Sequence, residues 1–351
     1  MKYMMPAEWE EHESTWLAWP HEESDWPGKF ELIPAVYCEL LKAITESEKV
    51  NLVLKNDKLA AQARALLDNA EVSNYQIHII DNDRCWMRDS APTCVYTADG
   101  LPHWISWKFN AWSKYDNFGK DQFMASEVAR ISGIAETRAV DTKTGLPVVL
   151  EGGAIDSDGE GTLLVTEECL MSPEQQRNSG FQKQDYERVF GEYLGTKVTI
   201  WLGQGIPGDD THGHIDGVCR FVAPGKVILC GPRRGESSYK KVFEDNIKRL
   251  SETKDAKGRS LEVVEIPLPS ELRYDGYVLP ASYANFLIGN KAVFIPIFKD
   301  ACDDEVLNIF AGLFPGRKIV GINCHDFILG LGAIHCITQP QFQNSKTLKA
   351  K

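Results

Sequence analysis

The sequence lacks paired cysteines, long hydrophobic runs and any excess of positive charge. Nine cysteines, an odd number, are scattered without a CxxC pair, which excludes a disulfide framework and a zinc ribbon. No stretch of 18 apolar residues exists, so we expect no membrane-spanning segment. The net charge of -12 argues against nucleic acid as a partner and favours cationic ligands.

Two further features are missing. The first residues contain no apolar signal core, so we expect a cytoplasmic protein. No Ser/Gly-rich linker or low-complexity run divides the chain, and its length alone allows one large domain or two. With 43% of 351 residues hydrophobic, the chain can bury a full core.

Apolar periodicity predicts alternating strands and helices, which is typical of an α/β fold. A sharp hairpin is expected over 281–296, with its turn at residues 289–290. The segments 147–150 and 163–166 are expected to pair as a second hairpin. Expected helices lie at 34–48, 58–67, 121–131, within 173–194, 237–250 and 303–313, and further strands at 50–54, 76–80, 104–112, 198–202, 218–222, 227–230, 261–266 and 318–322.

A glycine-rich stretch near the end carries the first candidate for chemistry. Gly330 and Gly332 lack a Cβ, so the backbone can pass close to a ligand there. Cys336 follows, flanked by Ile334 and Ile337. A thiol in this setting suits a nucleophile, and it equally suits a small buried hydrophobe.

Acids and histidines follow other predicted strands. Asp89 comes after an apolar strand and could be a turn former or a buried carboxylate, and Glu151 ends a second apolar segment. His212, His214 and Asp216 alternate, so on an extended backbone they would share one face.

These residues fit chemistry on a guanidinium group, which is planar and matches carboxylates bidentately. Asp89 and Asp216 could clamp the cation while Cys336 attacks its central carbon. The bound cation and a nearby imidazolium would lower the pKa of the thiol. His214 would protonate departing ammonia and then activate water, and Glu151 would orient His214.

Eight motifs make the sequence resemble the Porphyromonas-type peptidyl-arginine deiminase family, and within it the agmatine deiminases. They cover nearly the whole chain and together are highly specific. The matching segments are Cys85–Asp89, Phe109–Trp112, Glu151–Gly153, Glu160–Thr162, Thr166–Leu170, Gly213–Asp216, Ser282–Phe286 and Gly332–Gln339.

The resemblance implies a pentein β/α-propeller, with five ββαβ-type units in pseudo-fivefold symmetry. It implies one catalytic domain over residues 1–351, with a polar tail from about residue 340. It also implies hydrolysis of agmatine to N-carbamoylputrescine and ammonia, as in putrescine biosynthesis, through an amidino-cysteine at Cys336 and without cofactor or metal. Asp89, Glu151, His214 and Asp216 would fill the roles given above, and Asn285 and Gly332 in the matching motifs would contact substrate.

Two departures from the family pattern lie where the substrate tail would sit. The usual loop Asp-Glu-Thr-Asn-Gly-His is replaced by 209–214, with Asp210 and His212 at the changed positions, and Leu331 interrupts the glycine run. We still expect agmatine, a small cationic guanidino compound, because Asp210 could pair its far ammonium. Trp86 and Trp112 could line its methylene chain.

Other interpretations stay open at this point. Free arginine or peptidyl-arginine could be the substrate, although Arg88 and Arg220 are poorly placed to pair a carboxylate. An amidinotransferase would use the same covalent intermediate. A zinc-dependent hydrolase could use His212, His214 and Asp216, and a non-catalytic protein could keep the pocket for amines. The sequence does not give the oligomeric state, and it is compatible with a homo-oligomer.

Overall fold

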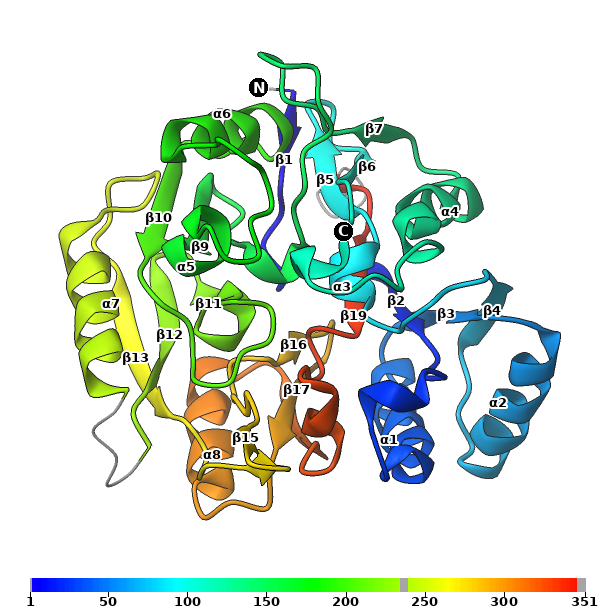
Figure 1. Cartoon of the computed structure of the whole chain (residues 1–351). Coiled ribbons are helices and arrows are strands. Elements are labelled where there is room, and N and C mark those ends of the chain that lie inside the picture. The colour runs from blue at the N-terminus through cyan, green and yellow to red at the C-terminus, as the bar shows by residue number, and fades with distance from the viewer. Residues whose placement is uncertain (1, 234–238, 346–351) are drawn as a thin grey trace.

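The computed structural model describes residues 2–233 and 239–345 (Figure 1). Five mixed sheets repeat one pattern: an antiparallel pair, then a helical segment, then a strand parallel to the second member of the pair. The triplets are β19–β2–β3 (Thr338–Phe342, His12–Ala18, Lys49–Leu54), β5–β6–β7 (Thr93–Thr97, Pro102–Ser106, Glu136–Arg138), β8–β9–β10 (Asp156–Ser157, Thr162–Thr166, Val198–Leu202), β11–β12–β13 (Cys219–Ala223, Lys226–Gly231, Glu262–Pro267) and β16–β17–β18 (Leu287–Ile288, Ala292–Ile297, Lys318–Asn323).

Three short additions complete the strands of the described residues. β4 (Tyr75–Ile79) extends the first sheet beside β3, and β1 (Tyr3–Met4) pairs with β5. β14 (Arg273–Tyr274) and β15 (Tyr277–Val278) form a separate small hairpin.

The longer helices lie around the outside of the molecule, whereas the short α3 (Met87–Ser90) lies near its centre (Figure 1). Apolar side chains at helical spacing explain this placement, because each helix buries one face against a sheet. In α1 the buried positions include Tyr37, Leu41 and Ile44. The peripheral helices are α1 (Ile33–Thr45), α2 (Asp57–Asn69), α4 (Met124–Ser132), α6 (Lys183–Tyr193), α7 (Lys240–Glu252) and α8 (Asp303–Leu313), and the shorter α5 (Glu167–Met171) follows β9.

The expected alternation of strands and helices is confirmed, but three local predictions are wrong. Strand β6 ends at Ser106, and Ala111–Ser113 form a 3₁₀ turn. Residues 147–150 make only isolated bridges, because the Asn178 side chain bonds both the N–H and the carbonyl of Val149. The segment 163–166 pairs instead with β8 and β10.

The polar tail begins later than the sequence indicates. Gln339–Phe342 belong to β19, which pairs antiparallel with β2 and so joins the two ends of the chain in one sheet. Gln341 also accepts a hydrogen bond of 2.9 Å from Trp16 Nε1. Residues 346–351 lie outside the described part, as do residues 237 and 238 of the helix expected over 237–250.

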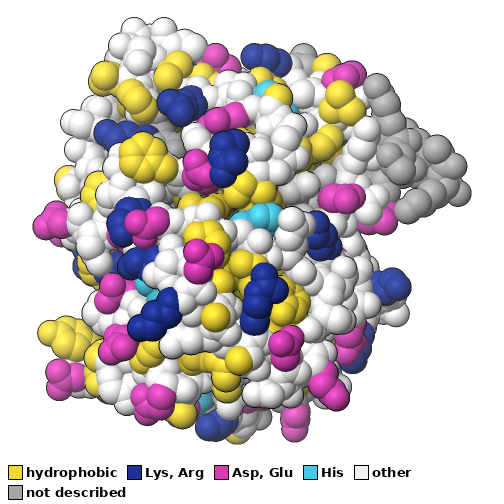
Figure 2. All heavy atoms as spheres, turned by 90° about the vertical axis from the view of Figure 1, so that its right-hand side faces the viewer, with side chains coloured by type: hydrophobic (Ala, Val, Ile, Leu, Met, Phe, Trp, Pro, Cys, Tyr) yellow, Lys and Arg dark blue, Asp and Glu magenta, His cyan; other side chains and the backbone are white. Residues whose placement is uncertain are grey.

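Charged groups of both signs are interspersed on the side of the molecule shown in Figure 2, with hydrophobic side chains scattered among them. Within the described residues, no helix combines the length and hydrophobicity that a membrane crossing requires.

A tryptophan cluster lies beneath the glycine-rich stretch. Trp26 is fully buried, packs against Trp86 at 5.6 Å between ring centroids, and donates a 2.7 Å hydrogen bond to the carbonyl of Phe327. Gly330 lies directly on this ring, since a Cβ there would be 2.7 Å from Trp26 Cε2. The absence of a side chain at Gly330 therefore lets this stretch rest on the cluster.

Gly330→Ala is predicted to destabilise the protein. The added methyl would collide with a ring that has no room to retreat, at a cost of about 1–3 kcal/mol. Gly312→Ala is the matched control, because a Cβ in this exposed turn of α8 meets nothing within 4 Å and should stabilise by about 0.5–1 kcal/mol. Urea unfolding measures both, and equal effects of the two changes would refute the packing argument.

Candidate active site

Cys336 faces a cavity of about 450 Å³. It follows a 3₁₀ turn, Phe327–Gly330, and Leu331, which adopts the left-handed region at φ 66°. The lining also includes most of the residues that the sequence assigned to substrate. Its members include Asp25, Arg84, Trp86, Asp89, Trp112, Tyr115, Asp210, Tyr274, Tyr277, Leu331 and Gly332.

Asn285 fixes the candidate nucleophile. Its amide nitrogen donates to Cys336 Sγ at 3.1 Å, and its oxygen accepts from the backbone N–H of His335 at 3.1 Å and of Cys336 at 3.3 Å. Neither Asn285 nor Asp216 is part of the cavity lining, and the contacts of both with substrate stay predictions.

The thiol of Cys336 is not activated in the unliganded site. Burial, then the negative charges of Asp216 and Asp89, raise the pKa of Cys336 well above its ordinary value, although the Asn285 hydrogen bond lowers it. A thiolate would place a third negative charge beside two carboxylates. An additional positive charge in the cavity is therefore needed before the nucleophile can form.

Asp89 is a buried carboxylate aimed at this cavity and not a surface turn former. It lies in α3, where its oxygens accept from Trp112 Nε1 at 2.8 Å and from the backbone N–H of Gly153 at 3.0 Å. Burial, with repulsion from Asp216 and Glu151, raises the pKa of Asp89 above its usual value. A cation bound beside Asp89 would relieve that repulsion.

Asp216 and His214 come from another turn. The predicted extended backbone is wrong here, since Ile215–Gly217 form a 3₁₀ turn. Asp216 nevertheless reaches the thiol, with Oδ2 at 3.5 Å from Cys336 Sγ. His212 turns away at φ 65°, and its Nε2 lies 2.9 Å from Ser172 Oγ.

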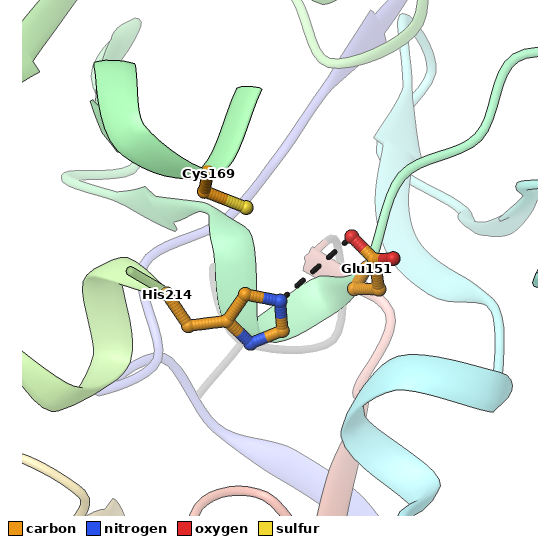
Figure 3. A group of neighbouring side chains, drawn as sticks. All are labelled: Glu151, Cys169 and His214. Carbon is orange, nitrogen blue, oxygen red and sulfur yellow. Dashed lines mark ion pairs between the residues drawn. The ribbon is translucent and has the colours of Figure 1, made fainter. Parts of the chain in front are cut away.

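The zinc set expected from His212, His214 and Asp216 is therefore not assembled. Among the described residues, the one group spaced for a metal is Glu151, Cys169 and His214, whose ligand atoms lie within 4.8 Å of one another (Figure 3). Arg177 already pairs with Glu151, with Nε 3.1 Å from Oε1. A metal ion there would have to approach this buried guanidinium, which disfavours it.

His214 is poised as an imidazolium. Its Nε2 is 3.7 Å from Glu151 Oε2, its Nδ1 is 3.9 Å from Asp89 Oδ2, and neither nitrogen has a hydrogen bond. Burial alone would lower its pKa, but Asp89, Cys169 and Glu151 raise the pKa of His214 well above its ordinary value. A protonated, unbonded ring beside a nucleophile suits proton delivery.

Arg177 holds Glu151 in place. Its Nη2 also donates to the carbonyl of Thr211 at 2.7 Å, which ties the Glu151 loop to the His214 loop. Burial would raise the pKa of Glu151, but Arg177 and His214 lower it to about 2. Sequence reasoning missed Arg177 because it lies in an irregular segment, 26 residues from its partner, with no periodic signal.

Two glycines allow this crowding. A Cβ on Gly153 would lie 2.6 Å from His214 Nδ1, and one on Gly332 would lie 2.7 Å from Trp86 Cζ3 and 3.1 Å from Cys336 Cβ. The Glu-Gly-Gly and Gly-x-x-x-Cys spacings therefore permit these side chains to pack closely, and contact of Gly332 with substrate stays a prediction.

The outer cavity carries both signs of charge. Asp210 pairs with Lys114 and accepts from Tyr115 Oη at 2.8 Å. Arg84 pairs with Asp25, whose pKa is raised to about 6 by burial despite this cation. Lys114 and Arg84 were not foreseen from the sequence, and both neutralise acids that could hold a cationic tail.

Comparison with known proteins agrees with this geometry. Residues 4–341 match the Porphyromonas-type peptidyl-arginine deiminase family. A putative agmatine deiminase of Marinomonas sp. (strain MWYL1) is 36% identical, over 96% of this chain and 94% of the relative.

Solved structures share the fold. The agmatine deiminase of Enterococcus faecalis superposes with a TM-score of 0.88 at 30% identity, covering 98% of this chain and 96% of that one. The C. jejuni agmatine deiminase with substrate bound gives 0.86 at 27% identity, covering 97% of each chain. The chain thus belongs to the Porphyromonas-type peptidyl-arginine deiminase family.

Proposed function

We propose that this protein is an agmatine deiminase, which hydrolyses agmatine to N-carbamoylputrescine and ammonia. The observation that carries the proposal is the position of Cys336, which lies 3.5 Å from Asp216 Oδ2 and lines the same cavity as Asp89, the carboxylate beside His214. Two carboxylates that flank a thiol suit a planar cation whose carbon is to be attacked. Full-length similarity to agmatine deiminases supports the same substrate.

The reaction follows from the charges. A bound guanidinium offsets Asp89 and Asp216, so Cys336 can release its proton to solvent and attack the central carbon as a thiolate. The C–N bond to the terminal nitrogen then breaks, and His214 supplies the proton with which ammonia leaves. Glu151, fixed by Arg177, keeps His214 oriented.

Attack by water on the covalent intermediate completes the catalytic cycle. His214, now neutral, accepts a proton from water as the water oxygen attacks the amidino carbon attached to Cys336. The C–S bond breaks, the ureido product departs, and the thiol is restored. No metal is needed in these steps, because the substrate itself brings the positive charge.

The outer cavity supports a short cationic tail. Trp86 and Trp112 line its wall, and Asp210 stands where a distal ammonium could pair. Arg88 and Arg220 do not line it. Arg84, the arginine that does, already pairs with Asp25, which weakens its attraction for a carboxylate tail.

Three broader assignments are part of this proposal. The five repeated strand–helix units are consistent with a pentein propeller of pseudo-fivefold symmetry. Pairing of β19 with β2 favours one catalytic domain over the chain. A cytoplasmic location remains a prediction from the sequence, with which a homo-oligomer is compatible.

A cationic alkylating agent should reveal the substrate-triggered thiol. At pH 7, 2-chloroacetamidine should modify Cys336 at least about a hundredfold faster than its neutral isostere 2-chloroacetamide, because only the amidine offsets Asp89 and Asp216. Peptide mass spectrometry identifies the labelled cysteine and gives the rates. Cys336→Ala is the control, and similar rates for the two reagents would contradict the mechanism.

Replacing either aspartate of the proposed guanidinium clamp should strongly lower kcat/KM. Asp89→Asn and Asp216→Asn leave the cation half-paired in a buried site, which costs on the order of 3–5 kcal/mol, so kcat/KM for agmatine should fall at least about a hundredfold. His214→Gln should lower kcat more than it raises KM. An ammonia-release assay on folded variants measures this, and near-native kinetics for either aspartate variant would remove that residue from the clamp.

Agmatine should be preferred over arginine and a blocked arginine peptide by at least about a hundredfold in kcat/KM, or about 2.7 kcal/mol. Asp210→Asn should erode this preference by raising KM for agmatine alone. Lys114→Met, which frees Asp210 from its ion pair, should lower that KM. Equal turnover of arginine or the peptide would overturn the substrate while leaving the deiminase chemistry intact.

A further inference from the structure

A group of buried charged side chains surrounds His335, the residue next to the candidate nucleophile Cys336. Its Nδ1 is 2.8 Å from Asp216 Oδ2, and its Nε2 is 2.9 Å from Glu8 Oε2. All three side chains are buried. Glu8 comes from the opposite end of the chain, so its presence here depends on tertiary folding alone.

The two carboxylates define the protonation state of His335. A neutral imidazole donates from one nitrogen only, whereas both nitrogens of His335 face carboxylate oxygens, and both donate only in the imidazolium form. Its backbone is fixed too, because its carbonyl accepts from Arg88 Nε at 3.2 Å and its N–H donates to Asn285 Oδ1.

A positive charge on His335 would balance the ionised carboxylates around it. Glu8 also pairs with Arg88 and Arg220, each at 3.0 Å, and Arg220 pairs with Asp156 at 2.6 Å. Three carboxylates, those of Glu8, Asp156 and Asp216, thus face two arginines and His335. A neutral His335 would leave one buried negative charge uncompensated, which is costly.

We propose that His335 is a positioning residue: as an imidazolium anchored by Glu8, it holds the Asp216 carboxylate ionised and aimed at the guanidinium and Cys336. This inference rests on the proposed function of the site, and it assigns a role to two residues that act through Asp216 without lining the cavity. The hydrogen bond from His335 lowers the pKa of Asp216, against the effect of its burial.

Two substitutions at His335 test its hydrogen bonds to Asp216 and to Glu8 separately. The amide nitrogen of Asn reaches the place of Nδ1 and can still donate to Asp216, whereas that of Gln reaches the place of Nε2 and can donate only to Glu8. Both variants lose the charge of His335, but only His335→Asn keeps the donor to Asp216. His335→Asn should therefore lower kcat/KM for agmatine by about tenfold, and His335→Gln by at least about a hundredfold.

The pH profile supplies a signature that a purely structural role lacks. Asp216 must be ionised to bind the cation, and without its donor its pKa rises. The acid limb of kcat/KM should therefore move to higher pH in both variants, and further in His335→Gln, which loses the hydrogen bond as well as the charge. His78→Asn is the control, because His78 Nε2 lies 2.9 Å from Asn51 Oδ1 and His78 is not part of the cavity lining; it should not move the limb.

Two further measurements test the role of His335 without turnover of a substrate. Labelling of Cys336 by 2-chloroacetamidine should slow in His335→Gln far more than in His335→Asn, so the inference is tested even if agmatine proves not to be the substrate. Ring ¹⁵N resonances of the wild-type protein should show a proton on each ring nitrogen of His335, because each faces a carboxylate oxygen. A neutral His335, or equal losses in both variants with unshifted acid limbs, would overturn the proposal, whether or not agmatine is turned over.

Discussion

Balance of buried charge is the constraint on which this site depends. Ten buried ionisable groups lie around Cys336. Five are carboxylates, namely Glu8, Asp89, Glu151, Asp156 and Asp216, and five are cations, namely Arg88, Arg177, His214, Arg220 and His335. With both histidines protonated and Cys336 neutral, the charges sum to zero.

In the proposed mechanism, that balance keeps the thiol protonated in the free site and lets a bound guanidinium activate it. A thiolate at Cys336 would add an unpaired negative charge in a low-dielectric interior, which is why the pKa of the thiol is raised. A guanidinium brings the compensating charge with it. Its arrival permits the nucleophile to form at the moment when the carbon to be attacked is in place, so a reactive thiolate is not exposed to other electrophiles.

The same charges make the site sensitive to acid. Burial opposes ionisation of Glu151, but Arg177 and His214 depress its pKa to about 2. A group whose pKa is depressed on folding contributes stability above its unfolded pKa, which is about 4.5 for glutamate, and that contribution fades as the pH falls toward 2. Breaking one pair would leave its partner as a buried lone charge, so the network has to be preserved as a whole.

Most of the candidate site residues could be predicted from the sequence, because the type of a residue limits the chemistry of its side chain. Cys336, His214, Glu151, Asp89 and Asp216 were selected from strand ends and glycines, and folding brings them together. The α/β order followed from apolar periodicity, which local sequence carries.

Only tertiary structure decided how the supporting residues are placed. His212 turns away from the site, and Lys114 pairs with Asp210. Glu8 and Arg177 contact the site residues His335 and Glu151. These contacts join segments far apart in the chain, and no local period or propensity encodes which buried charge will find which partner.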